Sequence, residues 1–448
     1  MLVLGTTAYA DGSTPQLATL DDGVRIICRN EPSSKLVAIT VLVQAGSEQE
    51  NLTDAGIGSM VADALLMGTT NQDSDAIAES IGDIGGNVKA IWEPDVTQIR
   101  ALVLPNEVTD AIYLICDVLK NANFTDTSVE NSRQDMLSRI QERSDDVFEA
   151  TNDRLRESLY DGTPFALPQI GTSSTIKRLT SADLITYFRR YYRPDNITIS
   201  VVGYIDPSAV VSTFAGNMSD FVRPRSHHTP PLVIPEPSNS SDPIIVKSYR
   251  RDVTAGLMMA GYLAPGVDSM DYPAMLVANA LLGGMKTSLM FKNLREKKLY
   301  GYEVASTYTT QIGLSDITGY ILYPVSAVGA DGKTHVDQTP LVKAALLDQF
   351  RTMTQVLPTD EELERAKKFV IGSYLLAHER IEDRSYYLGY SELAMTQDGG
   401  WKFDDSYAQA INAVTESDVL HVSKKYFSGA PVISLLLPGD PNAGVVND

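Results

Sequence analysis

Two long stretches of the chain match one another and decide how it is organised. Residues 180–203 read TSADLITYFRRYYRPDNITISVVG, and residues 415–439 read TESDVLHVSKKYFSGAPVISLLLPG. Val61–Gly68 (VADALLMG) and Val277–Gly284 (VANALLGG) form a second pair, placed in the same order within the chain. Separations of 235 and 216 residues indicate two similar halves in tandem rather than a short repeat.

Each half predicts the same succession of elements. A β-rich opening precedes an Ala/Leu helix, alternating strands, a long polar-faced helix, and a closing helix and strand. This mixture predicts an α+β fold of two tandem sandwich domains, each a mostly antiparallel sheet covered by helices on one face. The expected strands are 24–28, 37–44, 96–104 and 197–202, then 244–248, 256–263, 317–323 and 433–437; the long helices begin near Thr127 and Thr359.

The predicted domains are separated by a stretch rich in proline and serine. Residues 223–243 are expected to form an extended linker, because proline fixes φ and has no N–H to donate. This places the N-terminal domain at 17–222 and the C-terminal domain at 244–448. Residues 1–16 form an N-terminal arm, in which Met1–Ala10 resembles the end of a secretory signal peptide. A periplasmic or secreted location is therefore expected, although the missing basic region leaves the cytoplasm open.

The composition excludes several classes of protein. A formal net charge of −20 on 448 residues argues against a nucleic-acid partner, because the phosphate backbone is itself negative. No apolar run reaches the roughly 18 residues of a membrane-spanning helix, so no membrane partner is expected. The two cysteines, Cys28 and Cys116, are too few for a disulfide framework.

From Leu17 to about Pro438, the chain resembles the pitrilysin/insulinase superfamily of metallopeptidases, in its bacterial processing-peptidase-like branch. Ala45–Ser47 ends a strand, Ala55–Ile57 begins a helix, and Gly68-Thr69 ends that helix, as in the family. Catalytic members carry H-x-x-E-H on this helix. Its two histidines, with a glutamate from the next long helix, bind zinc, and its glutamate acts as the base.

The zinc motif itself is replaced in this chain. Ser59 and Asp63 occupy the positions of the two histidines, and Ala62 that of the catalytic glutamate. Arg139 falls where the resemblance places the third zinc ligand. We therefore expect no cofactor on this chain and no peptide hydrolysis by the chain alone. Because their charges are opposite, Asp63 and Arg139 are expected to form a buried salt bridge in place of the metal.

The second half keeps residues that the resemblance associates with substrate. Gly283-Gly284, Arg295-Glu296-Lys297 and Tyr302 match the family's pattern. The resemblance implies that the two glycines bind substrate, while Arg295 and Tyr302 hold its backbone and help to polarise the scissile carbonyl. A guanidinium and a phenol are suitable hydrogen-bond donors for that task. From composition alone, a surface Arg295 and a core Tyr302 remain the alternative.

One further departure concerns an edge strand of the first half. Lys89-Ala90 stands where catalytic relatives usually carry an asparagine-alanine pair. Family members bind substrate by adding it as a strand to this edge. Lysine at a sheet edge discourages such pairing, so the first half is expected to have lost substrate binding together with zinc.

These features predict the non-zinc subunit of a heterodimeric zinc metallopeptidase. The partner would be a homologous subunit that bears the zinc, and the substrate an unfolded, extended peptide. This chain would supply Arg295 and Tyr302 and close the substrate chamber. Two alternatives remain open: a purely structural or assembly subunit, and a peptide-binding module without catalysis.

Overall fold

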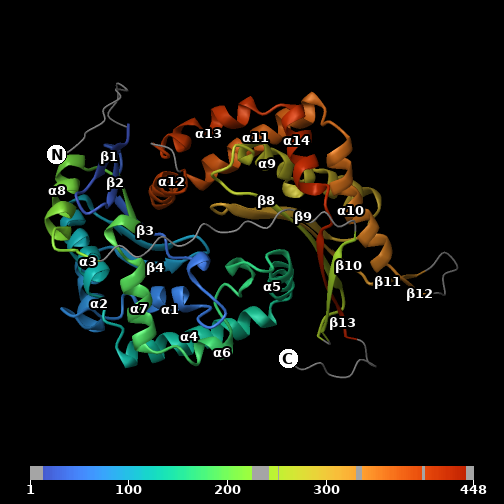
Figure 1. Cartoon of the computed structure of the whole chain (residues 1–448). Coiled ribbons are helices and arrows are strands. Elements are labelled where there is room, and N and C mark those ends of the chain that lie inside the picture. The colour runs from blue at the N-terminus through green and yellow to red at the C-terminus, as the bar shows by residue number, and fades with distance from the viewer. Residues whose placement is uncertain (1–13, 224–241, 251, 329–334, 396–398, 440–448) are drawn as a thin grey trace. The chain divides into compact units, whose positions relative to one another are not determined.

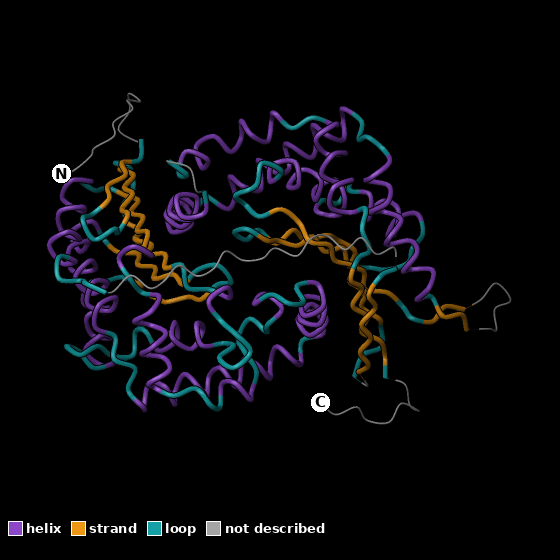
Figure 2. The backbone as a smooth tube through the Cα atoms, viewed as in Figure 1, coloured by secondary structure: helices purple, strands orange, loops and turns teal. Residues whose placement is uncertain are grey.

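The structure is a computed structural model that describes residues 14–223, 242–250, 252–328, 335–395 and 399–439. Met1–Ala10 and nearly all of the predicted linker lie outside the described residues. The chain divides into two compact units, one drawn from 1–141, 167–231 and 375–405, the other from 142–166, 232–374 and 406–448. Each unit contains one large sheet (Figures 1 and 2), so the predicted α+β class is confirmed.

The sheet of the first unit has six strands in the order β1-β2-β6-β3-β5-β4. β2 and β6 run parallel, and all other neighbours are antiparallel. β3 reads VAITVLV and is buried along its whole length, as is typical of a strand covered on both faces. The strands are β1 (Gln16–Thr19), β2 (Arg25–Asn30), β3 (Val37–Val43), β4 (Asn87–Trp92), β5 (Thr97–Val103) and β6 (Ile197–Gly203).

Helices from the same half of the sequence cover one face of this sheet. Successive side chains of a strand point to opposite faces, so Ile26 and Val41 lie on the covered face. They share a buried cluster with Met60, Ile115 and Tyr187 of the helices. The helices are α1 (Ile57–Ala64), α2 (Ser74–Asp83), α3 (Val108–Asn121), α4 (Asp126–Asp145), α6 (Ser173–Ile176), α7 (Ser181–Tyr191) and α8 (Pro207–Met218).

The second unit repeats this plan. Its sheet has the order β7-β13-β8-β10-β9, again with one parallel pair, β7 and β13, followed by antiparallel strands. The first unit has the same succession, with the parallel pair β2 and β6 followed by β3, β5 and β4. Such a shared order is expected for tandem halves of similar sequence. The strands are β7 (Ile244–Arg250), β8 (Gly256–Pro265), β9 (Glu303–Thr309), β10 (Leu314–Tyr323) and β13 (Val432–Pro438), with a separate hairpin of β11 (Ser326–Val328) and β12 (His335–Asp337).

Most helical segments of the second half of the sequence belong to the same unit as this sheet. Two of them, Ala280–Gly284 (η5) and Phe291–Lys297 (η6), are π-helical, a form that often occurs at functional sites. Thr359 and Glu362 form a reciprocal capping box at the start of α11, as their spacing predicts. The α-helices are α9 (Tyr272–Asn279), α10 (Thr339–Gln355), α11 (Asp360–Ala377), α13 (Lys402–Ala413) and α14 (Glu416–Phe427). Within the described residues, no helix is long and apolar enough to cross a membrane.

Each sheet also packs against one helix from the other half of the sequence. α12 (Ile381–Ala394) lies on the second face of the first sheet, where Leu388 shares a buried cluster with Ile27 and Val202. α5 (Val147–Leu159) lies on the second sheet, where Leu155 packs against Leu257 and Met259. Helices were expected on one face of each sheet only, and this expectation is wrong for both sheets.

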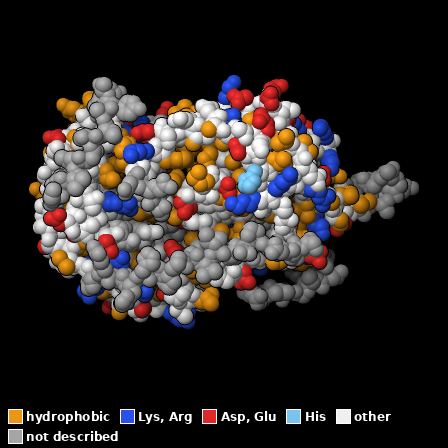
Figure 3. All heavy atoms as spheres, turned by 45° about the horizontal axis from the view of Figure 1, so that its top comes forward, with side chains coloured by type: hydrophobic (Ala, Val, Ile, Leu, Met, Phe, Trp, Pro, Cys, Tyr) orange, Lys and Arg blue, Asp and Glu red, His pale blue; other side chains and the backbone are white. Residues whose placement is uncertain are grey.

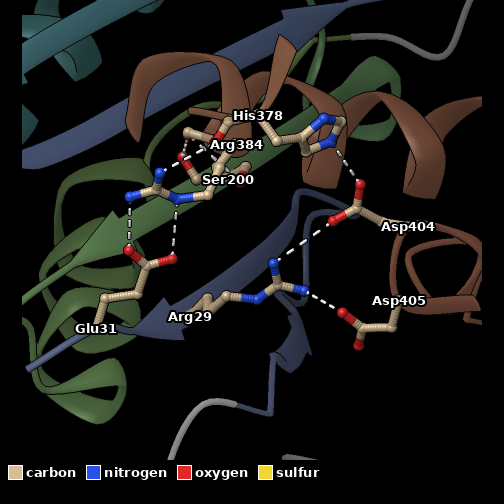
Figure 4. A network of polar contacts seen from close by, with 8 residues as sticks. Arg29, Glu31, Ser200, His378, Arg384, Asp404 and Asp405 are labelled. Atoms are coloured by element: carbon tan, nitrogen blue, oxygen red, sulfur yellow. Dashed lines mark hydrogen bonds and ion pairs between the residues drawn. The ribbon is translucent and has the colours of Figure 1, made fainter. Parts of the chain in front are cut away.

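Small residues and ion pairs hold α12 in place. Ser385 donates a hydrogen bond to the carbonyl oxygen of Ser200 at 3.1 Å, and a Cβ on Gly389 would lie 3.0 Å from the Ser200 side chain, so the helix backbone approaches the sheet closely. The Arg384 guanidinium donates to both carboxylate oxygens of Glu31, at 3.2 and 2.9 Å (Figure 4). A bidentate pair of this kind fixes orientation as well as position.

A second polar network links β2 to the chain around α12. Arg29 contacts Asp405 at 2.7 Å and Asp404 at 3.5 Å, and the His378 ring nitrogen lies 3.0 Å from Asp404 (Figure 4). Asp404 is almost completely buried, so its charge needs these partners. The network therefore fixes both flanks of α12 within the first unit.

Candidate functional site

A buried carboxylate, that of Glu50, binds the N-terminus of the helix that carries the degenerate motif. Glu50 accepts hydrogen bonds from the backbone amides of Gly56 at 2.8 Å and Gly58 at 2.9 Å. Gly56 is the N-cap of α1 with φ +89°, a conformation that favours glycine. Burial raises the pKa of Glu50 to about 8, although both hydrogen bonds lower it. Glu50 was not predicted from the sequence, because nothing in its spacing marks it as a buried group.

The structure brings together two of the four motif positions. Asp63, near the end of α1, forms an ion pair with Arg139 of α4, as predicted. The prediction that the pair is buried is wrong, because the Asp63 and Arg139 side chains are 25% and 43% exposed. Burial raises the pKa of Asp63 to about 6, even though Arg139 opposes the shift. Ser59 and Ala62 are buried on the same helix.

These residues do not fit a zinc ion. Zinc in proteins takes three or four deprotonated thiolate, imidazole or carboxylate ligands. Here the only such donor among the motif positions is Asp63, and its carboxylate is already paired with a guanidinium. Across the described ranges, no group of three or more His, Cys, Asp or Glu residues is arranged to hold a metal ion.

The edge strand beside this helix is β4. Among the described strands it pairs only with β5, and Lys89 lies directly across from Arg100. Like charges opposite each other destabilise a strand pair, and an exposed edge lysine opposes the addition of another strand. This geometry agrees with the expected loss of substrate binding at the edge strand. The loss itself stays a prediction.

In the second unit, Gly283 and Gly284 end the π-helical segment η5. Gly283 is buried against β9, where a Cβ would lie only 2.4 Å from the backbone nitrogen of Ser306. At Gly284 the nearest atom would be the Asn279 carbonyl oxygen at 3.2 Å. Gly283 therefore allows η5 to approach β9, and the substrate-binding role that the resemblance implies for both glycines stays a prediction.

Arg295 lies in the last turn of η6, and Tyr302 directly precedes β9, at the far end of the turn that joins the two elements. Arg295 is exposed, and its guanidinium lies 4.8 Å from the centre of the Phe291 ring. Tyr302 is 83% exposed, which rules out the alternative of a core tyrosine. Both donors are thus presented to solvent from one short, anchored turn, as a group that contacts a ligand must be.

One face of the molecule carries charged side chains of both signs (Figure 3). On the face shown in Figure 3, acidic and basic side chains are interspersed among hydrophobic ones. Elsewhere in the first unit, polar residues such as Thr69, Asn71 and Asn123 line a cavity of about 350 Å³, which none of the sequence motifs predicted.

Solved structures with the same fold are known. A protease from Helicobacter pylori superposes with a TM-score of 0.83 at 17% identity, over 95% of this chain and all of that chain. A Pseudomonas fluorescens structure described as a peptidase M16 inactive domain superposes with a TM-score of 0.82 at 18% identity, over 96% of this chain and all of that chain. At these identities the likeness shows the fold alone.

Sequence comparisons extend over the whole chain. An uncharacterized zinc protease of Rickettsia felis is 24% identical over 95% of this chain and 98% of its own length. The uncharacterized zinc protease YmxG of Bacillus subtilis is 24% identical over 94% and 97%. The family model described as Insulinase (Peptidase family M16) matches residues 25–173, and that described as Peptidase M16 inactive domain matches residues 178–370. The chain therefore belongs to the insulinase family of peptidases, within the pitrilysin/insulinase superfamily.

Proposed function

We propose that this chain is the non-zinc subunit of a heterodimeric zinc metallopeptidase that cleaves unfolded peptides. The observation that carries the proposal is a contrast between the two halves. The first half has an Asp63–Arg139 ion pair where zinc would be held, whereas the second presents Arg295 and Tyr302 to solvent. The partner would be a homologous subunit with an intact zinc motif.

In this proposal the two exposed donors act on the peptide bond that the partner cleaves. Arg295 donates N–H groups to a backbone carbonyl of the extended substrate and so positions it. Tyr302 donates its O–H where negative charge develops on the scissile carbonyl. The second half also closes the chamber that holds the peptide. In this proposal the chain alone hydrolyses no peptide, since its described residues hold no cluster of metal ligands.

The test combines zinc content with peptide cleavage. The purified chain is assayed alone and after mixing with a homologous zinc-bearing chain from the same organism. No zinc and no cleavage alone, with activity on mixing, supports the proposal. Stoichiometric zinc and cleavage by this chain alone would refute it. Binding without any gain in activity would favour the assembly subunit, and peptide binding without a partner would favour the peptide-binding module.

A substitution isolates the role of Arg295. We expect Arg295→Ala to lower cleavage by the complex about 100-fold, because a substrate displaced by about 1 Å loses roughly that much rate, with assembly unchanged. The matched control is Arg351→Ala, which removes an exposed arginine of α10 and should leave activity unaltered. An Arg295→Ala complex as active as the wild type would remove this role. 

We also place the complex in the periplasm or outside the cell. The support is the resemblance of Met1–Ala10 to the end of a signal peptide. Cell fractionation with N-terminal sequencing of the mature chain tests this location. A chain that retains residue 1 in the cytoplasmic fraction would overturn it.

A further inference from the structure

A leucine with left-handed backbone geometry follows η6. Leu299 has φ +54° and comes directly after the helix C-cap, Lys298. Glycine commonly occupies this position, because a Cβ in the left-handed region clashes with the backbone. Within the described residues, the only other non-glycine with positive φ is Phe124, which is buried. Leu299 instead is 77% exposed, so packing does not compensate for its strain.

The backbone of this turn is held firmly in place. The amide of Lys298 donates to the carbonyl of Asn293 at 3.1 Å, and that of Tyr300 donates to Leu294 at 2.9 Å. A Cβ on Gly301 would lie 2.4 Å from the carbonyl oxygen of Leu322, so the turn sits directly against β10. The turn geometry is therefore imposed by its surroundings, and glycine at position 299 would adopt it without strain. A strained residue that folding does not require points to function.

The side chains around Leu299 combine apolar surface with positive charge. Tyr302 is 83% exposed and lies three residues further along the turn. Arg295, Lys297 and Lys298 are exposed as well, and the turn contains one exposed carboxylate, Glu296, so its formal net charge is +2 (three cations minus one carboxylate). This cationic turn contrasts with the net charge of −20 of the whole chain.

We infer that the turn at residues 295–302 is a peptide-binding site that selects an apolar side chain next to a carboxylate. Leu299 and Tyr302 contact the apolar side chain, and the exposed cations of the turn bind the neighbouring carboxylate. The inference rests on the proposed function and adds the chemical class of its substrate. It makes Leu299 a residue that determines specificity.

The size of the site favours an extended peptide over a folded partner. A stable protein interface covers about 800 Å² on each partner, far more than two exposed side chains can provide. In an extended segment, residues i and i+2 point to the same face, so an apolar residue can lie on Leu299 while an acidic residue two positions away reaches the cations beside it. Charge complementarity with the net positive turn selects acidic over basic segments.

The experiment measures peptide binding to the whole purified chain by fluorescence anisotropy, without any zinc-bearing partner. The probes are three labelled decapeptides with serine at every second position, so that the remaining residues share one face of the extended peptide. In these remaining positions leucine alternates with aspartate in the first peptide, leucine with lysine in the second, and asparagine with aspartate in the third. We expect the leucine–aspartate peptide to bind at least tenfold more tightly than the other two. Leu299→Ala and Leu299→Gly should each weaken its binding about tenfold, whereas Met270→Ala, which truncates a 94% exposed methionine, should not.

The thermal stability of the same variants tests the argument from strain. Leu299→Gly should melt no lower than the wild type, because glycine adopts a positive φ freely. Equal affinity for the three peptides, wild-type binding by both Leu299 variants, or a lower melting temperature for Leu299→Gly would each overturn the inference. Since the assay needs neither zinc nor partner, its failure is distinguishable from failure of the chain to activate a zinc-bearing subunit.

Discussion

Replacing Glu50, whose buried carboxylate binds the N-terminus of α1, should make the stability of the first unit depend less on pH. Glu50 is 5% exposed, and burial raises its pKa from the usual 4.5 to about 8. Between these values the folded chain holds a proton on Glu50 that the unfolded chain has released. Wild-type stability should therefore fall as pH rises from about 4.5 to about 8, whereas Glu50→Gln lacks this contribution.

The magnitude follows from the structure. One pH unit corresponds to about 1.4 kcal/mol, so the upper bound on the loss across this range is ~5 kcal/mol. Against this, a glutamine has one acceptor oxygen and cannot serve both Gly56 and Gly58, at a cost of about 1–3 kcal/mol. Glu50→Gln should thus be less stable than the wild type at pH 5 and more stable at pH 8.

Urea unfolding at constant ionic strength, followed by tryptophan fluorescence, measures the difference. Both tryptophans, Trp92 and Trp401, belong to the first unit, so the signal reports the part of the chain that contains Glu50. Glu79→Gln, at an exposed position of α2, is the matched control and should show no crossover. A difference between Glu50→Gln and wild type that stays constant from pH 5 to pH 8 would refute the reasoning.

Two further predictions concern ion pairs of different burial. Arg139→Met should lower the free energy of unfolding by no more than about 1 kcal/mol, because its pair with Asp63 is partly exposed; a loss of several kcal/mol in urea unfolding would contradict the observed exposure. Arg156→Met should cost about 3–5 kcal/mol, because Arg156 and Asp316 are 6% and 4% exposed and only Tyr160 and Thr318 would remain to hydrogen-bond the buried carboxylate. If Arg156→Met melts at the same temperature as the wild type, measured by circular dichroism, then removing Arg156 does not leave the buried charge of Asp316 uncompensated.

Local sequence signals predicted most elements of the fold. The strand expected at 37–44 is Val37–Val43, and the one expected at 256–263 is Gly256–Pro265. The capping box at Thr359 formed as its spacing requires. Such features depend on neighbours within a few residues, which is why a single sequence reveals them.

The packing of α5 and α12 was not predictable in this way. The nearly continuous apolar sequence of β3 is typical of a strand covered on both faces, but helices were expected on one face only. However, the small residues Ser385 and Gly389 do not identify the sheet on which their helix packs. That choice depends on contacts between residues nearly 200 positions apart.

The candidate site was predicted in part. The opposite charges of Asp63 and Arg139 indicated their pairing, but the solvent access of the pair depends on the surrounding helices and was misjudged. The positive φ of Leu299 was also not predictable, because glycine adopts such a φ more readily and Gly301 stands only two residues later.

The packing of α12 on the first sheet has a consequence for shortened forms of the protein. A chain that stops before residue 381 would lack this helix and leave Ile27 and Val202 open to water. Likewise, a fragment that begins after residue 159 would lack α5 and uncover Leu257 and Met259 of the second sheet. Exposed apolar strand surfaces of this kind promote aggregation. Neither half of the sequence is therefore a self-sufficient folding unit, and a proteolytic cut between the halves would leave the two fragments bound to each other.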